Sequence, residues 1–318
     1  MYDQYNRKIE YMRISLTDRC NLHCTYCQPD VMQHVPHAEI LRYEEILRIC
    51  QAALALGITK FKITGGEPLL RKGCCDFIAQ LKALPAVEQV TLTTNGTLLP
   101  QFAPALKAAQ VDCVNVSLDT LDPAWYKKVT GGDVQAALQG LDALKAAGIR
   151  FKINCVPLEG MGVANILNLL KLADEYEVPL RFIELMPLMC NAALRGVNGS
   201  TIRSLLAQLG LYFILDKQTY GNGPATYYSI RGYKIPVGFI EPLHNKFCGT
   251  CNRMRLTAVG MLKPCLYSDV GLNLKRMLRD DVNDADIFSA MQEMIYTKPM
   301  GHGFENKPGM FNMSQIGG

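Results

Sequence analysis

Residues 11–27 read YMRISLTDRCNLHCTYC, a short apolar strand followed at once by three closely spaced cysteines. Cys20, Cys24 and Cys27 have the spacing Cys-x3-Cys-x2-Cys, which packing alone does not readily explain. A four-iron cluster usually takes one thiolate on each iron. Because the next cysteine is Cys50, a cluster on this triplet would keep one iron open for a ligand other than protein. A zinc site and ordinary core thiols are the alternatives that the spacing leaves open.

The strand before the cysteines begins a regular alternation of strands and helices. Helical patterns such as 44–56, 134–147 and 164–175 separate runs rich in β-branched residues. Near-continuous apolar runs such as VNVSL are typical of parallel strands buried on both faces. Polar residues close these runs, as in TTNG and SLD, at the strand ends where barrel sites form. The sequence predicts an α/β fold, an incomplete (β/α)6 TIM-like barrel with strands at 11–16, 60–64, 89–94, 113–118, 151–156 and 180–185.

The pattern changes after about residue 187. A helix is expected near 201–209, short strands around Gly232, and further helices over 272–278 and 284–296. We expect these elements to form a smaller C-terminal α+β lobe that closes the open side of the barrel. The predicted domains are therefore the partial barrel over 1–187, the lobe with a second cysteine cluster over 188–297, and a tail over 298–318.

Composition narrows the class of protein. The 318 residues are 49% hydrophobic, enough for one large or two ordinary domains. Twelve cysteines, six of them in two triplets, favour metal ligation in the cytoplasm over a secreted disulfide framework. No apolar run approaches the length of about 18 residues that a membrane span needs, so no membrane association is expected. The net charge of +4 does not predict nucleic-acid binding, but it suits a pocket for a small anion.

A second triplet, Cys248, Cys251 and Cys265, has the spacing Cys-x2-Cys-x13-Cys. His244 lies four residues upstream and could complete a Cys3His zinc site, so the spacing leaves zinc and an iron-sulfur cluster open. Arg253 and Arg255 follow directly, and in a strand their side chains would share one face. A buried triphosphate, with about four negative charges, needs several such cations.

Five further motifs follow successive predicted strands: TGGEP at 64–68, TTNG, NVSLD, FKIN and RFIELMPL. With the first triplet, they resemble the radical S-adenosylmethionine superfamily. With the second triplet, the chain from Arg13 to the final Gly-Gly resembles the GTP 3′,8-cyclases, which open molybdenum cofactor biosynthesis. The resemblance implies two [4Fe-4S] clusters and S-adenosylmethionine as cofactors. The implied ligands are Cys20, Cys24 and Cys27 for the first cluster and Cys248, Cys251 and Cys265 for the second.

The resemblance also implies contacts and a reaction. An adenosyl radical would take the C3′ hydrogen of GTP, and C3′ would then bond to C8 of a guanine held by the second cluster, giving 3′,8-cyclo-7,8-dihydro-GTP. Composition alone predicts a frayed C-terminus, whereas in the family a terminal Gly-Gly reaches the active site. The implied contacts are Tyr26, Gly66, Ser117 and Met186 for S-adenosylmethionine, Arg13, Thr93, Lys152, Arg253 and Arg255 for GTP, Lys62 as a possible GTP contact, and Gly317 and Gly318 from the tail.

Expected partners are GTP, an external one-electron reductant, cyclic pyranopterin monophosphate synthase as the next enzyme, and a second copy in a homodimer. Two other functions stay open: a peptide-modifying radical enzyme with an auxiliary cluster, and a non-enzymatic iron-sulfur carrier or sensor. The chain departs from the family at Lys62 and Cys113, where arginine is common, and in a short 188–200 segment. Six cysteines are predicted to be buried or incidental: Cys50, Cys74, Cys75, Cys113, Cys155 and Cys190.

Overall fold

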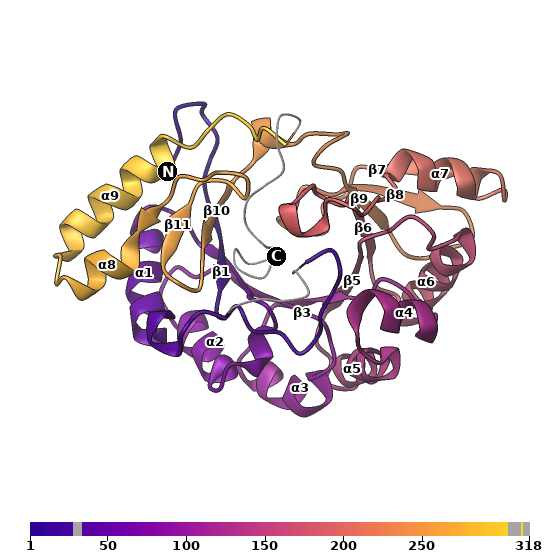
Figure 1. The fold of residues 1–318 in the computed structure, drawn as a ribbon, viewed down its shortest axis with the longest axis horizontal. Coiled ribbons are helices and arrows are strands. Elements are labelled where there is room, and N and C mark those ends of the chain that lie inside the picture. The colour runs from indigo at the N-terminus through magenta and orange to yellow at the C-terminus, as the bar shows by residue number, and fades with distance from the viewer. Residues whose placement is uncertain (28–33, 305–312, 314–318) are drawn as a thin grey trace.

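The computed structural model describes residues 1–27, 34–304 and 313, and it contains all six expected strands. At least one helix follows each strand, so the predicted (β/α)6 arrangement is confirmed. Figure 1 shows the strands lining the inside of an open arc and the helices covering its outside. The elements are β1 (Tyr11–Ser15), α1 (Tyr43–Ala55), β2 (Lys60–Thr64), α2 (Cys74–Lys82), β3 (Gln89–Thr94), α3 (Leu99–Ala108), β4 (Cys113–Ser117), α4 (Pro123–Thr130), α5 (Val134–Ala146), β5 (Phe151–Cys155), α6 (Val163–Tyr176) and β6 (Leu180–Ile183).

The C-terminal residues lengthen the same sheet at both edges. On one side β9 pairs in parallel with β6, and on the other β10 pairs in parallel with β1. The strand order is β12-β11-β10-β1-β2-β3-β4-β5-β6-β9-β8-β7. The added elements are α7 (Gly199–Ala207), β7 (Phe213–Asp216), β8 (Thr226–Ile230), β9 (Val237–Ile240), β10 (Arg253–Leu256), β11 (Met261–Lys263), β12 (Leu272–Asn273), α8 (Leu274–Arg279) and α9 (Asp284–Tyr296).

Two details differ from the expectation. The sheet does not close: in the described part of the chain, β7 and β12 remain its two edges, and the C-terminal strands extend the barrel rather than capping it. The helix expected over 272–278 begins two residues later, because Leu272–Asn273 pairs with β11. The Asn273 side chain then accepts a hydrogen bond from the Arg276 amide and caps α8.

Alternation along the strands separates an apolar outer face from a polar inner face. Met12 and Ile14 in β1 and Phe61 and Ile63 in β2 are fully buried in the hydrophobic core. The residues between them, such as Arg13 and Lys62, line the interior of the arc. This period of two therefore places polar side chains from every barrel strand around one space. Among the described residues, no helix is long and apolar enough to span a membrane.

Candidate active site

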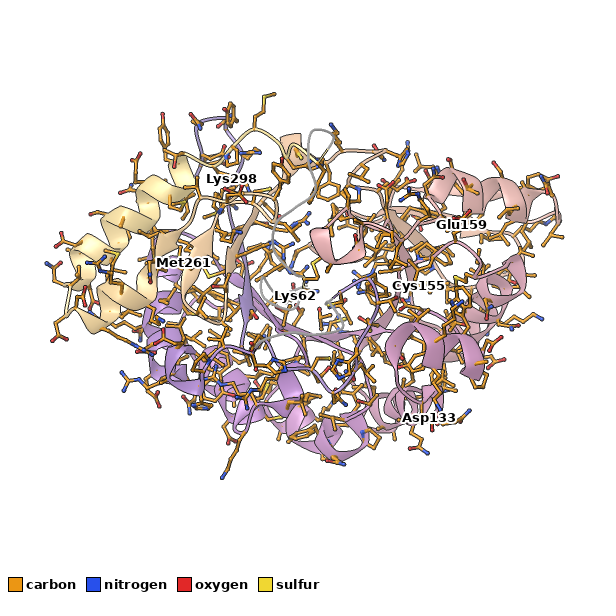
Figure 2. The ribbon with its side chains drawn as sticks, viewed as in Figure 1. Lys62, Asp133, Cys155, Glu159, Met261 and Lys298 are labelled. Carbon is orange, nitrogen blue, oxygen red and sulfur yellow. The ribbon has the colours of Figure 1, made fainter. Side chains whose placement is uncertain are left out.

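The inner faces of the barrel strands surround one cavity of about 350 Å³. Every predicted site residue that the structure describes lines this cavity. Figure 2 shows Lys62 in the middle of the arc and Lys298 at its rim. Gly317 and Gly318 lie outside the described residues. The lining includes Arg13, Cys20, Cys24, Tyr26, Cys27, Lys62, Gly66, Thr93, Ser117, Lys152, Met186, Cys248, Cys251, Arg253, Arg255 and Cys265.

A row of cations crosses three neighbouring strands inside the cavity. Arg13 of β1 is opposite Arg255 of β10 on one side and Lys62 of β2 on the other. Burial, together with Arg13 and Arg253, lowers the pKa of Arg255 to about 9. Burial and the nearby Arg181 and Arg13 lower the pKa of Lys62 well below its usual value. A bound polyanion would relieve this repulsion between like charges.

Lys152 and Arg253, two further cations that line the cavity, also favour an anionic ligand. Burial and Arg181 lower the pKa of Lys152 to about 8. The Nε atom of Arg253 is buried and has no hydrogen-bond partner among the described residues, while its guanidinium lies 4.9 Å from the centre of the Phe247 ring. A buried donor without an acceptor costs free energy that a ligand oxygen could recover.

Arg181 is a cavity residue that we did not single out from the sequence. It is 6% exposed, and its Nε donates to Asn154 Oδ1 at 2.8 Å. Its Nη2 donates to Asn115 Oδ1, so one guanidinium connects the three neighbouring strands β4, β5 and β6. The signal was present: Arg181 opens RFIELMPL and lies two residues before Ile183, which lines the same cavity.

The first cysteine triplet lies in the loop after β1, held against the end of β2. The Gly66 amide donates to the Thr17 carbonyl at 2.7 Å, and the Glu67 amide donates to the Arg19 carbonyl at 2.8 Å. A Cβ on Gly66 would lie 2.3 Å from the Arg19 carbonyl oxygen, so only glycine fits here. The glycines of TGGEP thus fix the position of the cysteine loop.

Tyr26 and Asp119 connect this loop to β4. The Tyr26 hydroxyl donates to Asp119 Oδ2 at 2.7 Å, and the Val156 amide donates to Asp119 Oδ1 at 2.8 Å. Burial is the main cause that raises the pKa of Asp119, to about 6. The hydroxyl of Tyr26 is therefore fixed at the cavity wall between the cysteine loop and Ser117.

The two triplets lie in opposite electrostatic surroundings. Burial, then Cys27 and Asp119, raise the pKa of the Cys24 thiol well above its usual value. Burial also acts to raise the pKa of Cys251, but Lys298 and Arg253 outweigh it and the net pKa is lowered. Since thiolates are the metal ligands, Cys251 is more readily deprotonated for metal binding than Cys24.

Both cysteine triplets present their thiols to the cavity. Among the described residues, no three His, Cys, Asp or Glu side chains gather around a point where one ion could sit. Thiolates are ligands both of tetrahedral zinc and of iron-sulfur clusters, and a measurement of bound metal distinguishes the two. His244 pairs through Nδ1 with Glu184 Oε1, and it is not among the described residues that line the cavity with Cys248, Cys251 and Cys265.

The six other cysteines are free thiols, most of them buried. Cys50, Cys74 and Cys155 lie in the hydrophobic core. Cys113 departs from the prediction of an incidental residue in one respect: it lines the cavity, in register with Thr91, which is itself in register with Lys62.

An open parallel barrel with a cysteine loop after its first strand defines the class of this protein, the radical S-adenosylmethionine superfamily, whose family model matches residues 14–173. A second model, described as Molybdenum Cofactor Synthesis C, matches residues 178–304. The chain is 41% identical to the GTP 3′,8-cyclase of Heliobacterium modesticaldum and 40% identical to that of Petrotoga mobilis, over all of each chain. It therefore belongs to the GTP 3′,8-cyclase family.

A likeness to solved structures bears on the fold alone. Streptococcus suis SuiB bound to precursor peptide SuiA superposes with a TM-score of 0.64 at 14% identity, covering 96% of this chain and 75% of that one. SuiB bound to S-adenosylmethionine gives a TM-score of 0.62 at 17% identity, covering 89% of this chain and 68% of that one.

Proposed function

We propose that the chain is a radical S-adenosylmethionine enzyme that converts GTP to (8S)-3′,8-cyclo-7,8-dihydroguanosine 5′-triphosphate, the first step of molybdenum cofactor biosynthesis. One observation carries the proposal: a cross-strand row of cations and two cysteine triplets line a single cavity. A triphosphate fits the cations, and the triplets suit a radical source at one end and a base-binding site at the other. Family membership supports the same reaction.

The superfamily whose model matches residues 14–173, and so includes the first triplet, carries a [4Fe-4S] cluster and S-adenosylmethionine. Cys20, Cys24 and Cys27 would hold that cluster, which when bound supplies the electron that cleaves S-adenosylmethionine to a radical able to remove the C3′ hydrogen of GTP. We assign a second [4Fe-4S] cluster to Cys248, Cys251 and Cys265, where its open iron would take the guanine base.

The chain's own residues would bind and orient the two molecules. Tyr26, Gly66, Ser117 and Met186 are our candidates for S-adenosylmethionine, since they line the cavity. Arg13, Lys62, Thr93, Lys152, Arg253 and Arg255 are our candidates for GTP. Guanidinium groups donate in pairs to phosphate oxygens, so Arg13 and Arg255 would fix the nucleotide more tightly than Lys62. Fixing C8 near C3′ in a site that excludes water favours ring closure over quenching.

The remaining assignments are proposals of the same kind. An external one-electron reductant would supply the electrons, and cyclic pyranopterin monophosphate synthase would take the product. We also propose a homodimer and a cytoplasmic location.

Metal content gives a first test. Protein prepared without oxygen should hold about eight irons per chain, one four-iron cluster on each triplet. Iron and zinc analysis with Mössbauer spectroscopy measures this. Zinc bound at Cys248, Cys251 and Cys265 would contradict the second cluster.

Single cysteine variants test the division of labour. Cys24→Ala should abolish cleavage of S-adenosylmethionine, because the cluster that binds the cofactor is lost. Cys251→Ala should keep some cleavage but stop cyclisation. Chromatographic assay of 5′-deoxyadenosine and of the nucleotide product measures both, and equal loss of both activities in a folded Cys251→Ala protein argues against the assignment.

A further inference from the structure

Two buried cations, Arg7 and Lys298, lie beside the second cysteine triplet. Arg7 is 6% exposed and Lys298 is 2% exposed. Neither was among the residues that the sequence singled out. They come from opposite ends of the chain, yet both donate to backbone carbonyls in the cysteine-bearing segments.

The Arg7 guanidinium donates to backbone carbonyls in two segments that are far from it in the sequence. Its Nη1 donates to the Cys248 carbonyl at 2.8 Å and to the Met300 carbonyl at 3.0 Å. Its Nη2 donates to the carbonyls of Pro299 at 2.8 Å and Lys298 at 3.2 Å. The buried Asp3 balances its charge, accepting from Arg7 Nε at 2.6 Å. A planar fork can serve this many acceptors at once, whereas an ammonium group cannot.

Lys298 does the same for the other two cysteines. Its Nζ donates to the Arg253 carbonyl at 2.9 Å, two residues after Cys251, and to the Pro264 carbonyl, next to Cys265. Each cysteine of the second triplet thus lies within two residues of a backbone carbonyl that accepts a hydrogen bond from one of these two cations. Arg7 also binds the carbonyl of Lys298 itself, so the two cations form one connected unit.

The chain after Lys298 continues from this unit along the cavity. A Cβ on Gly301 would lie 3.8 Å from Cys248 Sγ, so the segment passes beside this cysteine of the second triplet. His302 Nε2 contacts the Pro242 carbonyl at 2.8 Å, and Phe304 packs edge-on to Tyr267. Farther along, the Met313 amide donates to the Cys27 carbonyl at 3.1 Å, which places that residue at the first triplet.

We propose that Arg7 and Lys298 are positioning residues that hold the three cysteines of the second triplet and the start of the C-terminal segment as one rigid assembly. The geometry of the second triplet and the position of residues 299–304 are then set together. This inference deepens the proposed function and rests on it for the catalytic arm of its test. Removing Arg7 takes the donor away from four backbone carbonyls, and removing Lys298 takes it away from two, which should loosen the assembly.

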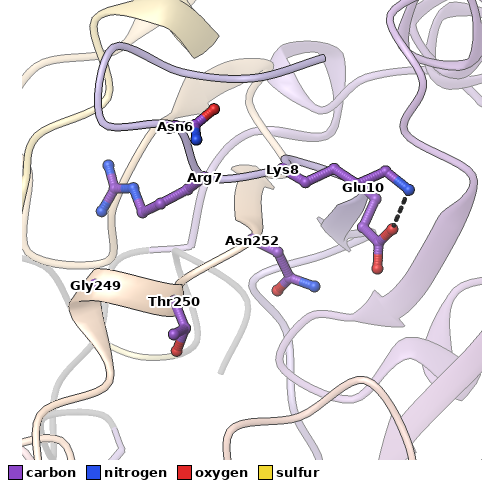
Figure 3. A pocket seen from close by; sticks show the side chains of 7 residues that line it. All are labelled: Asn6, Arg7, Lys8, Glu10, Gly249, Thr250 and Asn252. Atoms are coloured by element: carbon purple, nitrogen blue, oxygen red, sulfur yellow. Dashed lines mark ion pairs between the residues drawn. The ribbon is translucent and has the colours of Figure 1, made fainter.

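Lys8 offers a matched control. It follows Arg7 directly, carries the same charge and lines a surface pocket with Arg7, Gly249 and Thr250. Figure 3 shows Arg7 and Lys8 extending in opposite directions, with Lys8 paired to Glu10. The Lys8 side chain is 61% exposed, and its ion pair to Glu10 spans 3.3 Å. Lys8→Met therefore removes a neighbouring charge without touching the assembly.

The experiment compares Arg7→Met, Arg7→Lys, Lys298→Met and Lys8→Met in the full chain. The first readout is backbone hydrogen exchange over 248–251 and 299–304 in metal-free protein. The second is the ratio of cyclised nucleotide to 5′-deoxyadenosine in the loaded enzyme. We expect Arg7→Met and Lys298→Met to raise exchange and lower the ratio by at least about tenfold, as the loss of charge-assisted hydrogen bonds implies. First-cluster iron should be retained, and Lys8→Met should match the wild type in both readouts.

Arg7→Lys keeps the charge but loses the fork, so it should show a smaller change of the same sign, and it serves if Arg7→Met does not fold. Wild-type exchange and a wild-type ratio in Arg7→Lys and Lys298→Met would overturn the inference. Equal change in Lys8→Met would overturn it as well, since the effect would then be one of net charge. If the wild type makes no cyclised nucleotide, the proposed function fails, and the exchange arm still decides the inference.

Discussion

At the level of single residues, the cavity concentrates positive charge that the protein itself does not fully neutralise. Lys152, with its pKa lowered to about 8, is mostly charged at pH 7 and mostly neutral at pH 9. A bound polyanion favours the ammonium form and raises this pKa. Nucleotide binding above pH 8 should therefore take up protons, while binding at pH 7 takes up few.

Calorimetry of GTP binding at pH 9, in two buffers with different ionisation enthalpies, measures this uptake. Lys152→Arg should reduce it, because a guanidinium stays protonated at this pH more readily than Lys152. Binding at pH 9 without proton uptake by the wild type would show that Lys152 does not face the nucleotide.

Arg253 and Arg255 give a second prediction at this scale. Replacing either by alanine should weaken GTP binding by on the order of 1.5–3 kcal/mol, the value of a lost charge-assisted contact. S-adenosylmethionine binding should change much less. Equilibrium binding of both ligands to each variant provides the measurement, and unchanged GTP affinity in both variants would remove these arginines from the nucleotide site.

At the level of elements, the loop between β7 and β8 closes part of the cavity beside Lys152. Gly221, Asn222 and Gly223 line the cavity, and Asn222 Nδ2 donates to Gln89 Oε1. Gly221 has φ 135°, and a Cβ there would lie 2.8 Å from Lys152 Nζ. The positive φ therefore favours glycine at this position, and a methyl group there would require the Lys152 ammonium, at the flexible end of its side chain, to shift.

Gly221→Ala should displace Lys152 and weaken GTP binding about fivefold or more, on the order of one charged hydrogen bond. Gly232→Ala is the control: Gly232 also has a positive φ, 92°, but a Cβ there meets nothing within 4 Å. A loss of GTP affinity that is equal in the two variants would mean that backbone strain alone is responsible.

The elements also show what the sequence could and could not predict. Strands β1–β6 were predictable because each carries a local apolar run that ends in polar residues. The pairing of Arg13 with Arg255 was not, because β1 and β10 are more than 200 residues apart and register over that separation leaves no local signal. Arg7 and Lys298 escaped notice for the same reason: each looks like an ordinary surface cation until the fold buries it.

At the level of the whole molecule, the N-terminal residue Arg7 and residues 298–300 meet beside Cys248 of the second triplet, and Met313 contacts Cys27 of the first. The contact between Met313 and Cys27 brings this segment to the edge of the proposed cofactor site. Gly317 and Gly318 lie outside the described residues, so their entry into the cavity stays a prediction. A terminus without side chains could enter a narrow site, and its carboxylate could pair with arginine.

Deleting Gly317 and Gly318 should leave iron content and thermal stability unchanged while severely lowering cyclisation. Cleavage of S-adenosylmethionine should continue, uncoupled from product. Iron analysis, thermal unfolding and product assay of the truncated protein measure these quantities, and normal turnover would return the terminus to an ordinary frayed end.

The central claim is that one cavity brings the radical source to C3′ of GTP. Its most direct measurement is anaerobic incubation of the full chain with S-adenosylmethionine, a strong reductant and GTP deuterated at C3′, followed by mass analysis. We expect one deuterium in 5′-deoxyadenosine and a product that has lost it. Unlabelled 5′-deoxyadenosine together with unchanged GTP would show that the radical does not act at C3′ of GTP.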